Sequence, residues 1–413
     1  MKHKQFPHTQ LDGIKAFRPY VIRCAKEEAK ARVARGDVGP TGSINDSPWI
    51  DELLRQAQVA LLADSGLLKF GPAESFFDGK FIRQDVLGER GASVLARVVM
   101  TANYEFHSLV NFELSGNKTF RFADLLVEEL AQTSSNVSAE YVHLPFSTCC
   151  FVIESRVAIE AFHQFMRRGS NQPDLLSEEA FATPLTVFLH ELEPKEETLG
   201  HPGLLFNVSH GDAKHQWGMA KRQILLNPAW DVEKALHTDW EKIHEEAAIE
   251  APRVGMRFTV DSDEVQGIED QTFYEDGLFF FRLLTNMILY VTSTDPDLLP
   301  REQDGPDPVT LAKMSSKDRR TLEREAERMA GMAVIEAGAR LTPLVVDPRA
   351  VVDTAARPTS GNAGRYSVRF KVRGGWRPRR VGPGRKEVKI VWVREHWKGP
   401  QMADLVNRHY EVR

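Results

Sequence analysis

The chain has 413 residues, of which 42% are hydrophobic and 27% are charged. These fractions match those of folded soluble proteins and exclude both a wholly disordered chain and a membrane-embedded one. At roughly 150 residues per domain, the length predicts two or three structural units. No apolar stretch follows the first basic residues, so we expect no secretory signal and a cytoplasmic protein without membrane contact.

Charge is distributed unevenly along the chain. The net charge is −5 overall, but residues 365–413 contain fourteen Lys and Arg against four Asp and Glu, a net charge of +10. The first 364 residues therefore carry a net charge of −15. Such asymmetry favours contact of the basic end with nucleic acid or another polyanion, which the acidic part would repel.

The first 70 residues are predicted to be helical. Ile14, Phe17, Val21 and Cys24 recur at helical spacing, and a second apolar stripe follows Pro48. From residue 71 onward, helical patterns alternate with apolar, strand-like runs, which favours a sheet covered by helices. The helical patterns are at residues 94–109 and 122–132, and the strand-like runs are at 149–153, 185–189 and 204–208.

Two more helices are predicted before residue 295. Residues 231–251 have mixed charges and few apolar anchors, which is typical of a surface helix. Residues 277–292 are apolar on nearly their whole circumference, which indicates a buried helix. The polar residues Arg282 and Asn286, and an apolar run shorter than the roughly 20 residues that span a bilayer, argue against a membrane segment.

Two stretches have the composition of linkers. Residues 295–308 combine acidic residues with Pro, and residues 357–364 are rich in Gly, Pro, Ser and Asn. A charged helix is predicted between them, over residues 315–332. The expected division is an N-terminal helical segment (1–70), an α/β body (71–296), an acidic Pro-rich linker (297–314), a helix and second linker (315–364) and a basic β module (365–413). We predict the body and the basic module to be separable.

The basic module shows the alternation of an antiparallel β arrangement. Apolar and polar residues alternate over 366–373 and again over 388–393, with a Gly-Pro-Gly turn at 382–384 between them. The predicted fold class is therefore α+β, a mixed α/β body with a small antiparallel β, strongly basic C-terminal module.

No metal site or cofactor is predicted. His190-Glu191 resembles the start of a metalloprotease motif, but Pro194 stands where the second His belongs. A loop would have to bring His210, Asp212 and His215 together, and no other segment supplies a further ligand. The three cysteines, Cys24, Cys149 and Cys150, cannot form a disulfide framework, and the adjacent pair lies in an apolar run, which favours packing.

The sequence contains no recognised catalytic motif. It has no phosphate-binding loop, dinucleotide fingerprint, nucleophile elbow or kinase signature. Paired acids such as Glu245-Glu246 lie on predicted surface helices, where solvated carboxylates are common. We therefore predict a protein that is not an enzyme.

The segment 372–380 is the strongest candidate for a binding site. Its arginines can bind phosphate through two hydrogen bonds, and its Trp can stack on an unpaired base. In the alternative interpretation the Trp packs inward and the cations only solubilise a small β unit. The candidate nucleic-acid-binding residues are Arg373, Trp376, Arg377, Arg379, Arg380, Lys389 and Trp392.

Three segments together carry a family resemblance. Residues 144–153 have a Leu-Pro turn leading into an apolar strand, and residues 283–291, followed by Asp-Pro-Asp, have a buried helix ended by an acidic turn. The third segment joins Val-Arg-Gly-Gly-Trp at 372–376 to Gly382, Gly384 and the strand 388–392. Over about residues 140–400 the chain thereby resembles an anti-CRISPR family, the second-numbered class acting against type V-A systems. The chain has Gly375 where that family usually has His.

This resemblance implies a regulator of the large Cas nuclease of type V-A systems, of a kind encoded by phages, plasmids and other mobile elements. It implies recognition of the nascent Cas polypeptide during translation, followed by mRNA degradation. The expected partners are the Cas effector polypeptide and RNA or the ribosome. Two alternatives remain open: a direct inhibitor that binds the Cas nuclease or its guide RNA, and an unrecognised nuclease acting on RNA.

Overall fold

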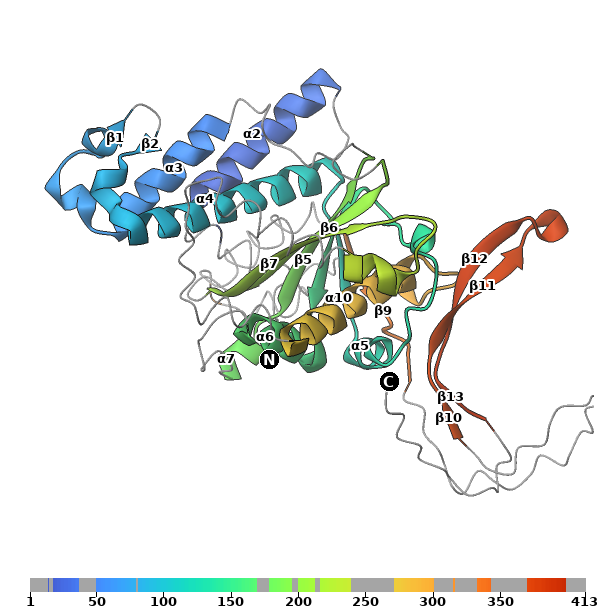
Figure 1. The fold of residues 1–413 in the computed structure, drawn as a ribbon. Coiled ribbons are helices and arrows are strands. Elements are labelled where there is room, and N and C mark those ends of the chain that lie inside the picture. Colours follow the sequence, from blue (N-terminus) through green and yellow to red (C-terminus); the bar gives the residue numbers. More distant parts are fainter. Residues whose placement is uncertain are drawn as a thin grey trace, which may run out of the picture.

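The computed structural model describes residues 14, 18–36, 50–78, 81–168, 178–194, 200–211, 216–238, 271–300, 315, 333–342 and 370–398. Helices surround a mixed sheet, and a separate antiparallel ribbon lies near the C-terminal end (Figure 1). The predicted α+β class is confirmed. Within the described residues, no helix combines the length and the apolar character that crossing a membrane requires.

The central sheet has seven strands in the order β7-β6-β5-β4-β3-β9-β8. Strand β3 runs parallel to β4 and β9, and the remaining neighbours are antiparallel. Every residue of β4 is buried, as expected for a strand covered on both faces. The strands are β3 (Lys118–Phe122), β4 (Thr148–Ile153), β5 (Leu185–Leu192), β6 (Gly203–Gly211), β7 (Gln216–Leu225), β8 (Leu298–Pro300) and β9 (Ala333–Ala337).

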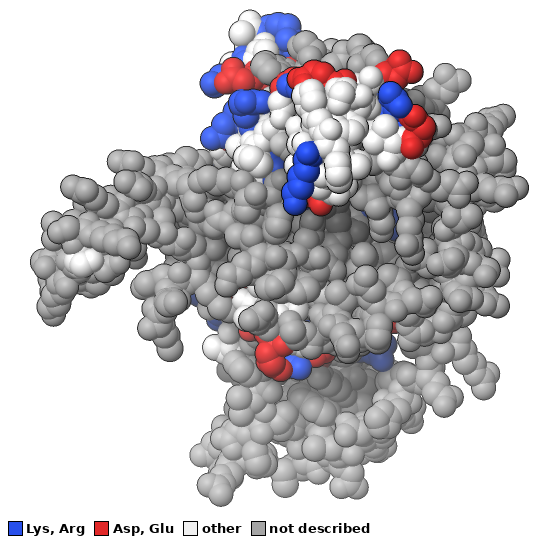
Figure 2. All heavy atoms as spheres, turned by 90° about the vertical axis from the view of Figure 1, so that its left-hand side faces the viewer, with Lys and Arg blue, Asp and Glu red and all other residues white. Residues whose placement is uncertain are grey.

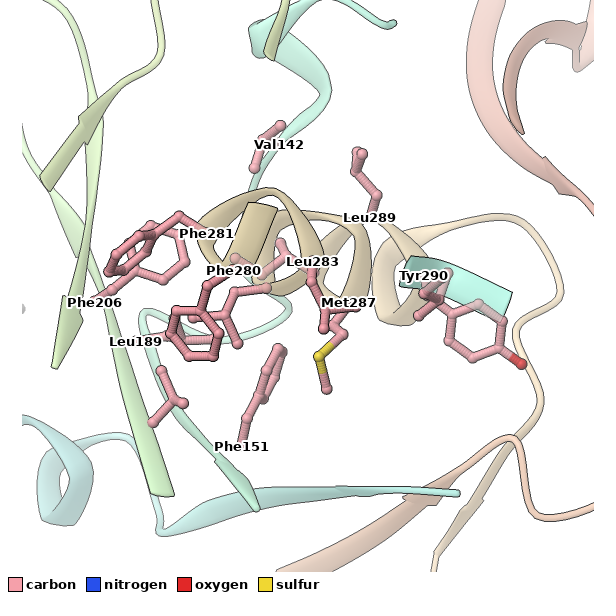
Figure 3. Packing of buried hydrophobic residues seen from close by; sticks show 14 of the residues in the cluster. Val142, Phe151, Leu189, Phe206, Phe280, Phe281, Leu283, Met287, Leu289 and Tyr290 are labelled. Atoms are coloured by element: carbon pink, nitrogen blue, oxygen red, sulfur yellow. The ribbon is translucent and has the colours of Figure 1, made fainter. Parts of the chain in front are cut away.

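One face of the sheet is covered by α5 (Asp124–Ala131), α6 (Arg156–Arg168) and α10 (Gln271–Thr292). Figure 3 shows aromatic side chains of α10 directed toward Phe151 and Phe206 of the sheet. Burying one such side chain contributes roughly 1.5–3 kcal/mol. The buried helix predicted over residues 277–292 is confirmed, and it begins six residues earlier, at Gln271.

The opposite face is covered by α2 (Pro19–Arg35) and α4 (Gln84–Leu114), with α3 (Ile50–Asp64) packed beside them. Small elements complete this end: η1 (Leu67–Phe70), η2 (Ala73–Phe76), β1 (Phe77–Asp78) and β2 (Phe81–Ile82). The short helix α7 (Glu178–Phe181) precedes β5. Cys149 and Cys150 point to opposite faces of the sheet and both are buried, which agrees with packing roles.

The chain returns to the central sheet both within and after the first predicted linker. Strand β8 lies within the expected acidic linker, and it pairs with β9, which lies in the expected 315–364 segment. Strand β9 in turn pairs with β3 of the body. The remaining residues of both linkers, most of the predicted 315–332 helix and residues 239–251 lie outside the described part of the chain.

The basic module forms an antiparallel ribbon, as its alternation predicted. Strand β10 (Phe370–Val372) pairs with β13 (His396–Lys398), and β11 (Gly375–Val381) pairs with β12 (Glu387–Val393). The predicted Gly-Pro-Gly turn is confirmed and overlaps the short helix η5 (Pro383–Arg385). The β11–β12 hairpin projects away from the body (Figure 1).

A buried polar layer lies between part of α4 and the sheet. The imidazole of His190 lies 3.1 Å from the Thr148 hydroxyl through Nδ1 and 3.3 Å from the Ser108 hydroxyl through Nε2. Asn207 donates to the same Ser108 oxygen at 2.7 Å. Burial, with a smaller contribution from the charge of Lys221, lowers the pKa of His190 to about 3.

This layer predicts that acid destabilises the fold through His190. Between its unfolded pKa of 6.5 and about 3, the unfolded chain binds a proton that the folded chain excludes. The contribution of neutral His190 to the free energy of unfolding is therefore complete above pH 6.5. It is lost as the pH falls below that value, by up to about 1.4 kcal/mol per pH unit. Urea unfolding at pH 7 and pH 5 should show a smaller loss of stability for His190→Gln than for the wild type.

The exposed His143 provides the matched control, because His143→Gln removes an imidazole without touching the polar layer. That variant should lose as much stability as the wild type between the two pH values. Equal losses for the wild type and His190→Gln would show that His190 does not set the acid sensitivity.

Candidate nucleic-acid interface

The ribbon crosses the body where the loop after α5 meets the C-terminal half of α10. The backbone N–H of Ser134 donates to the Gly374 carbonyl at 3.4 Å, and Ser134 forms a parallel bridge with Gly375. On the other strand, the backbone N–H of Thr294 donates to the Ile390 carbonyl at 2.9 Å. Both strands of the ribbon are thus tied to the body by main-chain bonds.

Asn286 of α10 is the centre of this attachment. Its side-chain oxygen accepts hydrogen bonds from the Trp376 indole at 2.8 Å and from the Ser135 hydroxyl at 2.9 Å. Its side-chain nitrogen donates to the carbonyls of Leu130 at 3.1 Å and Thr133 at 2.9 Å. Asn286 is buried, so these four bonds satisfy the amide without water.

Trp392 and Arg394 hold the second strand. The Trp392 indole donates to the Thr133 hydroxyl at 3.3 Å, and its ring meets Tyr290 edge to face at 5.2 Å. The guanidinium of Arg394 forms a bidentate ion pair with the buried carboxylate of Glu129 on α5. That hydrogen-bonded contact, with the carboxylate charge, raises the pKa of Arg394.

Gly374 allows the ribbon to approach the body closely. A Cβ atom at this position would lie 2.9 Å from the Thr133 hydroxyl oxygen and 3.4 Å from the Val393 carbonyl oxygen. At Gly375, the position where the resembled family usually has His, the nearest atom would be the Ser134 hydroxyl oxygen at 3.5 Å. Position 374 therefore has no room for a side chain, whereas a Cβ atom at position 375 would make an ordinary van der Waals contact.

The two tryptophans of the predicted site face the body. Trp376 is only 6% exposed and Trp392 is partly buried, and both indole N–H groups are bonded to the body. In this arrangement the Trp376 ring has no free face on which a base could stack. The geometry agrees with the inward-packing interpretation for both residues and leaves the cations as the outward-facing part of the site.

The cations of the predicted site are exposed on the ribbon. They are Arg373, Arg377, Arg379, Arg380 and Lys389. Side chains alternate between the two faces of a strand, and the register pairs Trp376 with Trp392 and Arg379 with Lys389. One face therefore carries the two tryptophans, and the other carries Arg377, Arg379 and Lys389. We call this second set the cationic face.

Some exposed cations elsewhere in the structure have acidic neighbours. Arg23 and Arg55 lie 3.4 and 3.0 Å from Glu52, and Lys30 lies 3.0 Å from Glu27. Among the residues coloured in Figure 2, positive and negative side chains are correspondingly intermixed. Within the described part of the chain, no acidic side chain pairs with any member of the cationic face.

The metal and protease candidates lie in different surroundings. His190 is buried in the polar layer, and Glu191 accepts a hydrogen bond from the Leu144 backbone. His210 is buried against His163 at 2.8 Å, while Asp212 and His215 lie outside the described residues. Over the ranges that the structure describes, no group of three His, Cys, Asp or Glu side chains is placed to hold a metal ion.

The model of the AcrVA2-like family, described as the anti-CRISPR type V subtype A2 family, matches residues 120–397. The chain belongs to this anti-CRISPR family. The match begins within β3 and ends within β13, so both the sheet and the ribbon lie inside it. The resemblance seen in the three sequence segments is thereby confirmed.

A solved structure of AcrVA2 aligns with 94% of this chain and 97% of its own, with 10% sequence identity and a TM-score of 0.38. Comparison with curated proteins gives no match. The assignment of this anti-CRISPR protein to the family therefore rests on the family model. The matched range does not include the helices α2, α3 and α4.

Sequence reasoning missed the attachment of the ribbon to the body. Asn286, Thr133, Ser135, Glu129 and Arg394 were not among the predicted site residues. One signal was present: Asn286 is a polar residue in a helix that is apolar on nearly all sides, and a buried amide requires hydrogen-bond partners.

The close approach at Gly374 predicts that the family member will not tolerate a side chain there. Gly374→Ala should lower the free energy of unfolding by about 1–3 kcal/mol, because Thr133 and the strand must shift apart. Gly375→Ala, with 3.5 Å to its nearest neighbour, is the matched control and should change stability by less than about 0.5 kcal/mol. Urea unfolding of both variants checks this, and equal losses would contradict the packing shown.

Proposed function

We propose that this anti-CRISPR protein is a non-enzymatic regulatory adaptor. It recognises the nascent Cas effector polypeptide of a type V-A system in the cytoplasm and lowers production of the effector through loss of its message. The α/β body recognises the polypeptide, and the basic ribbon contacts RNA or the ribosome. Family membership supports the Cas-directed role.

The observation that carries the RNA contact is the cationic face. Three exposed cations, none of them ion-paired within the described residues, stand on a ribbon that projects from an acidic body. Exposed cations with no internal partner are available to an external polyanion, and phosphate contacts supply most of the sequence-independent affinity for nucleic acids. The acidic body disfavours the same ligand elsewhere on the molecule.

The adaptor hypothesis predicts that the encoded polypeptide, and not the nucleotide sequence, marks the message for loss. In cells producing this protein, both the effector and its message should fall in amount. A synonymously recoded message should be lost equally, because its polypeptide is unchanged. A message with a frameshift after the start codon, which keeps nearly all nucleotides but changes the polypeptide, should be spared.

Cleavage by purified, guide-loaded nuclease separates the adaptor from a direct inhibitor. The adaptor should leave target cleavage intact, whereas a direct inhibitor would block it with effector and message levels unchanged. Incubation of the purified protein with RNA alone tests the nuclease alternative, which requires degradation products in the absence of any other protein.

A further inference from the structure

We propose that the cationic face binds double-helical RNA through its phosphates and does not read unpaired bases. This inference rests on the proposed RNA contact and names the form of RNA. Single-strand binding without sequence preference combines a cationic groove with aromatic rings on which bases stack. Duplex RNA is recognised largely by shape and by contacts to phosphates and 2′-hydroxyls.

The placement of aromatic rings disfavours unpaired RNA. In the described ribbon, Trp376 and Trp392 lie on the face opposite the cationic face, and the indole N–H groups of both are bonded to the body. The neighbouring side chains on the cationic face are not aromatic: Val391 lies opposite Arg377, and Val381 lies opposite Glu387. This face therefore offers charge but no stacking surface.

The spacing of the cations suits the regularly spaced phosphates of a duplex RNA backbone. Arg377 and Arg379 are two residues apart on one strand, which separates them by about 6.6 Å along it. Lys389 lies directly opposite Arg379, at about 4.5–5.5 Å between Cβ atoms. Like charges in opposite positions destabilise a strand pair. An anionic ligand between them would relieve this repulsion.

The ribbon is also supported at its base. Strand β11 has seven residues, a length of roughly 23 Å at about 3.3 Å per residue. Its base is fixed by Trp376 and Asn286, and its far end carries the exposed cations Arg385 and Lys386 beside the turn. A row of cations on a supported ribbon can follow the surface of a duplex without first ordering a flexible segment.

The test uses the full-length protein and one RNA sequence in two forms: a 20-base-pair duplex, and one of its strands chosen to lack self-pairing. Binding is measured across a salt series. The duplex should bind at least tenfold more tightly at low salt. With three to five phosphate contacts, and with the value of about 0.9 per phosphate for B-form DNA applied to the RNA duplex, the log-log slope should lie near −3 to −5.

The decisive variant replaces Arg377, Arg379 and Lys389 with Gln and should flatten the duplex slope by about 2 to 3 units. The matched control replaces Arg23, Lys30 and Arg55 with Gln, which removes the same charge from the N-terminal helices. It should keep the wild-type slope. Equal thermal midpoints of the ribbon variant and the wild type would show that the first variant is folded.

Equal affinity for the duplex and the single strand would overturn this inference while leaving the proposed RNA contact in place. Absence of binding to either RNA at low salt would overturn both. Equal flattening by the two triple variants would show that overall charge, and not the cationic face, governs binding. Binding of polyglutamate as tight as that of the duplex would show a general polyanion surface and would also overturn the inference.

Discussion

The buried amide of Asn286 is the constraint on which the position of the ribbon depends. Its four hydrogen bonds join α10, the loop after α5 and the ribbon at one point. Leaving a buried donor or acceptor without a partner costs about 1–3 kcal/mol per group. A displaced ribbon would leave the Trp376 indole and part of the amide unsatisfied, so the network favours one arrangement over near alternatives.

This attachment separates two roles within a short segment. Alternation along β11 sends Trp376 toward the body and Arg377 to the opposite face, and β12 repeats the division with Trp392 and Lys389. The aromatic residues therefore stabilise the fold while the cations remain available to a ligand. Arg394 differs from these available cations, because its bidentate ion pair with Glu129 attaches the ribbon to the body.

Much of the local structure followed from periodicity. The all-round apolar pattern of α10 and the alternation of the ribbon each predicted an element that the structure contains. The orientation of Trp376 could not be predicted in this way, since alternation defines two faces but not which one meets the body. Its partner Asn286 lies 90 residues away in sequence.

The presence of β8 and β9 in the central sheet could not be predicted from the sequence either. Strands β8 and β9 have three and five residues, too few to show a clear period, and they join the sheet through partners far away in the chain. The acidic Pro-rich composition around β8 was typical of a linker, yet Pro300 is compatible with the outermost strand of a sheet.

Hydrogen exchange of the Trp376 indole N–H tests whether this ring is held against the body by Asn286. In protein labelled with ¹⁵N at Trp, Trp376→Phe identifies the resonance by its disappearance. Our account predicts slow exchange, because the N–H is buried and bonded to Asn286, with the same rate and chemical shift when duplex RNA is bound. Rapid exchange in the free protein, or a large shift on adding single-stranded RNA, would show that the ring is free to stack on bases and would contradict the account.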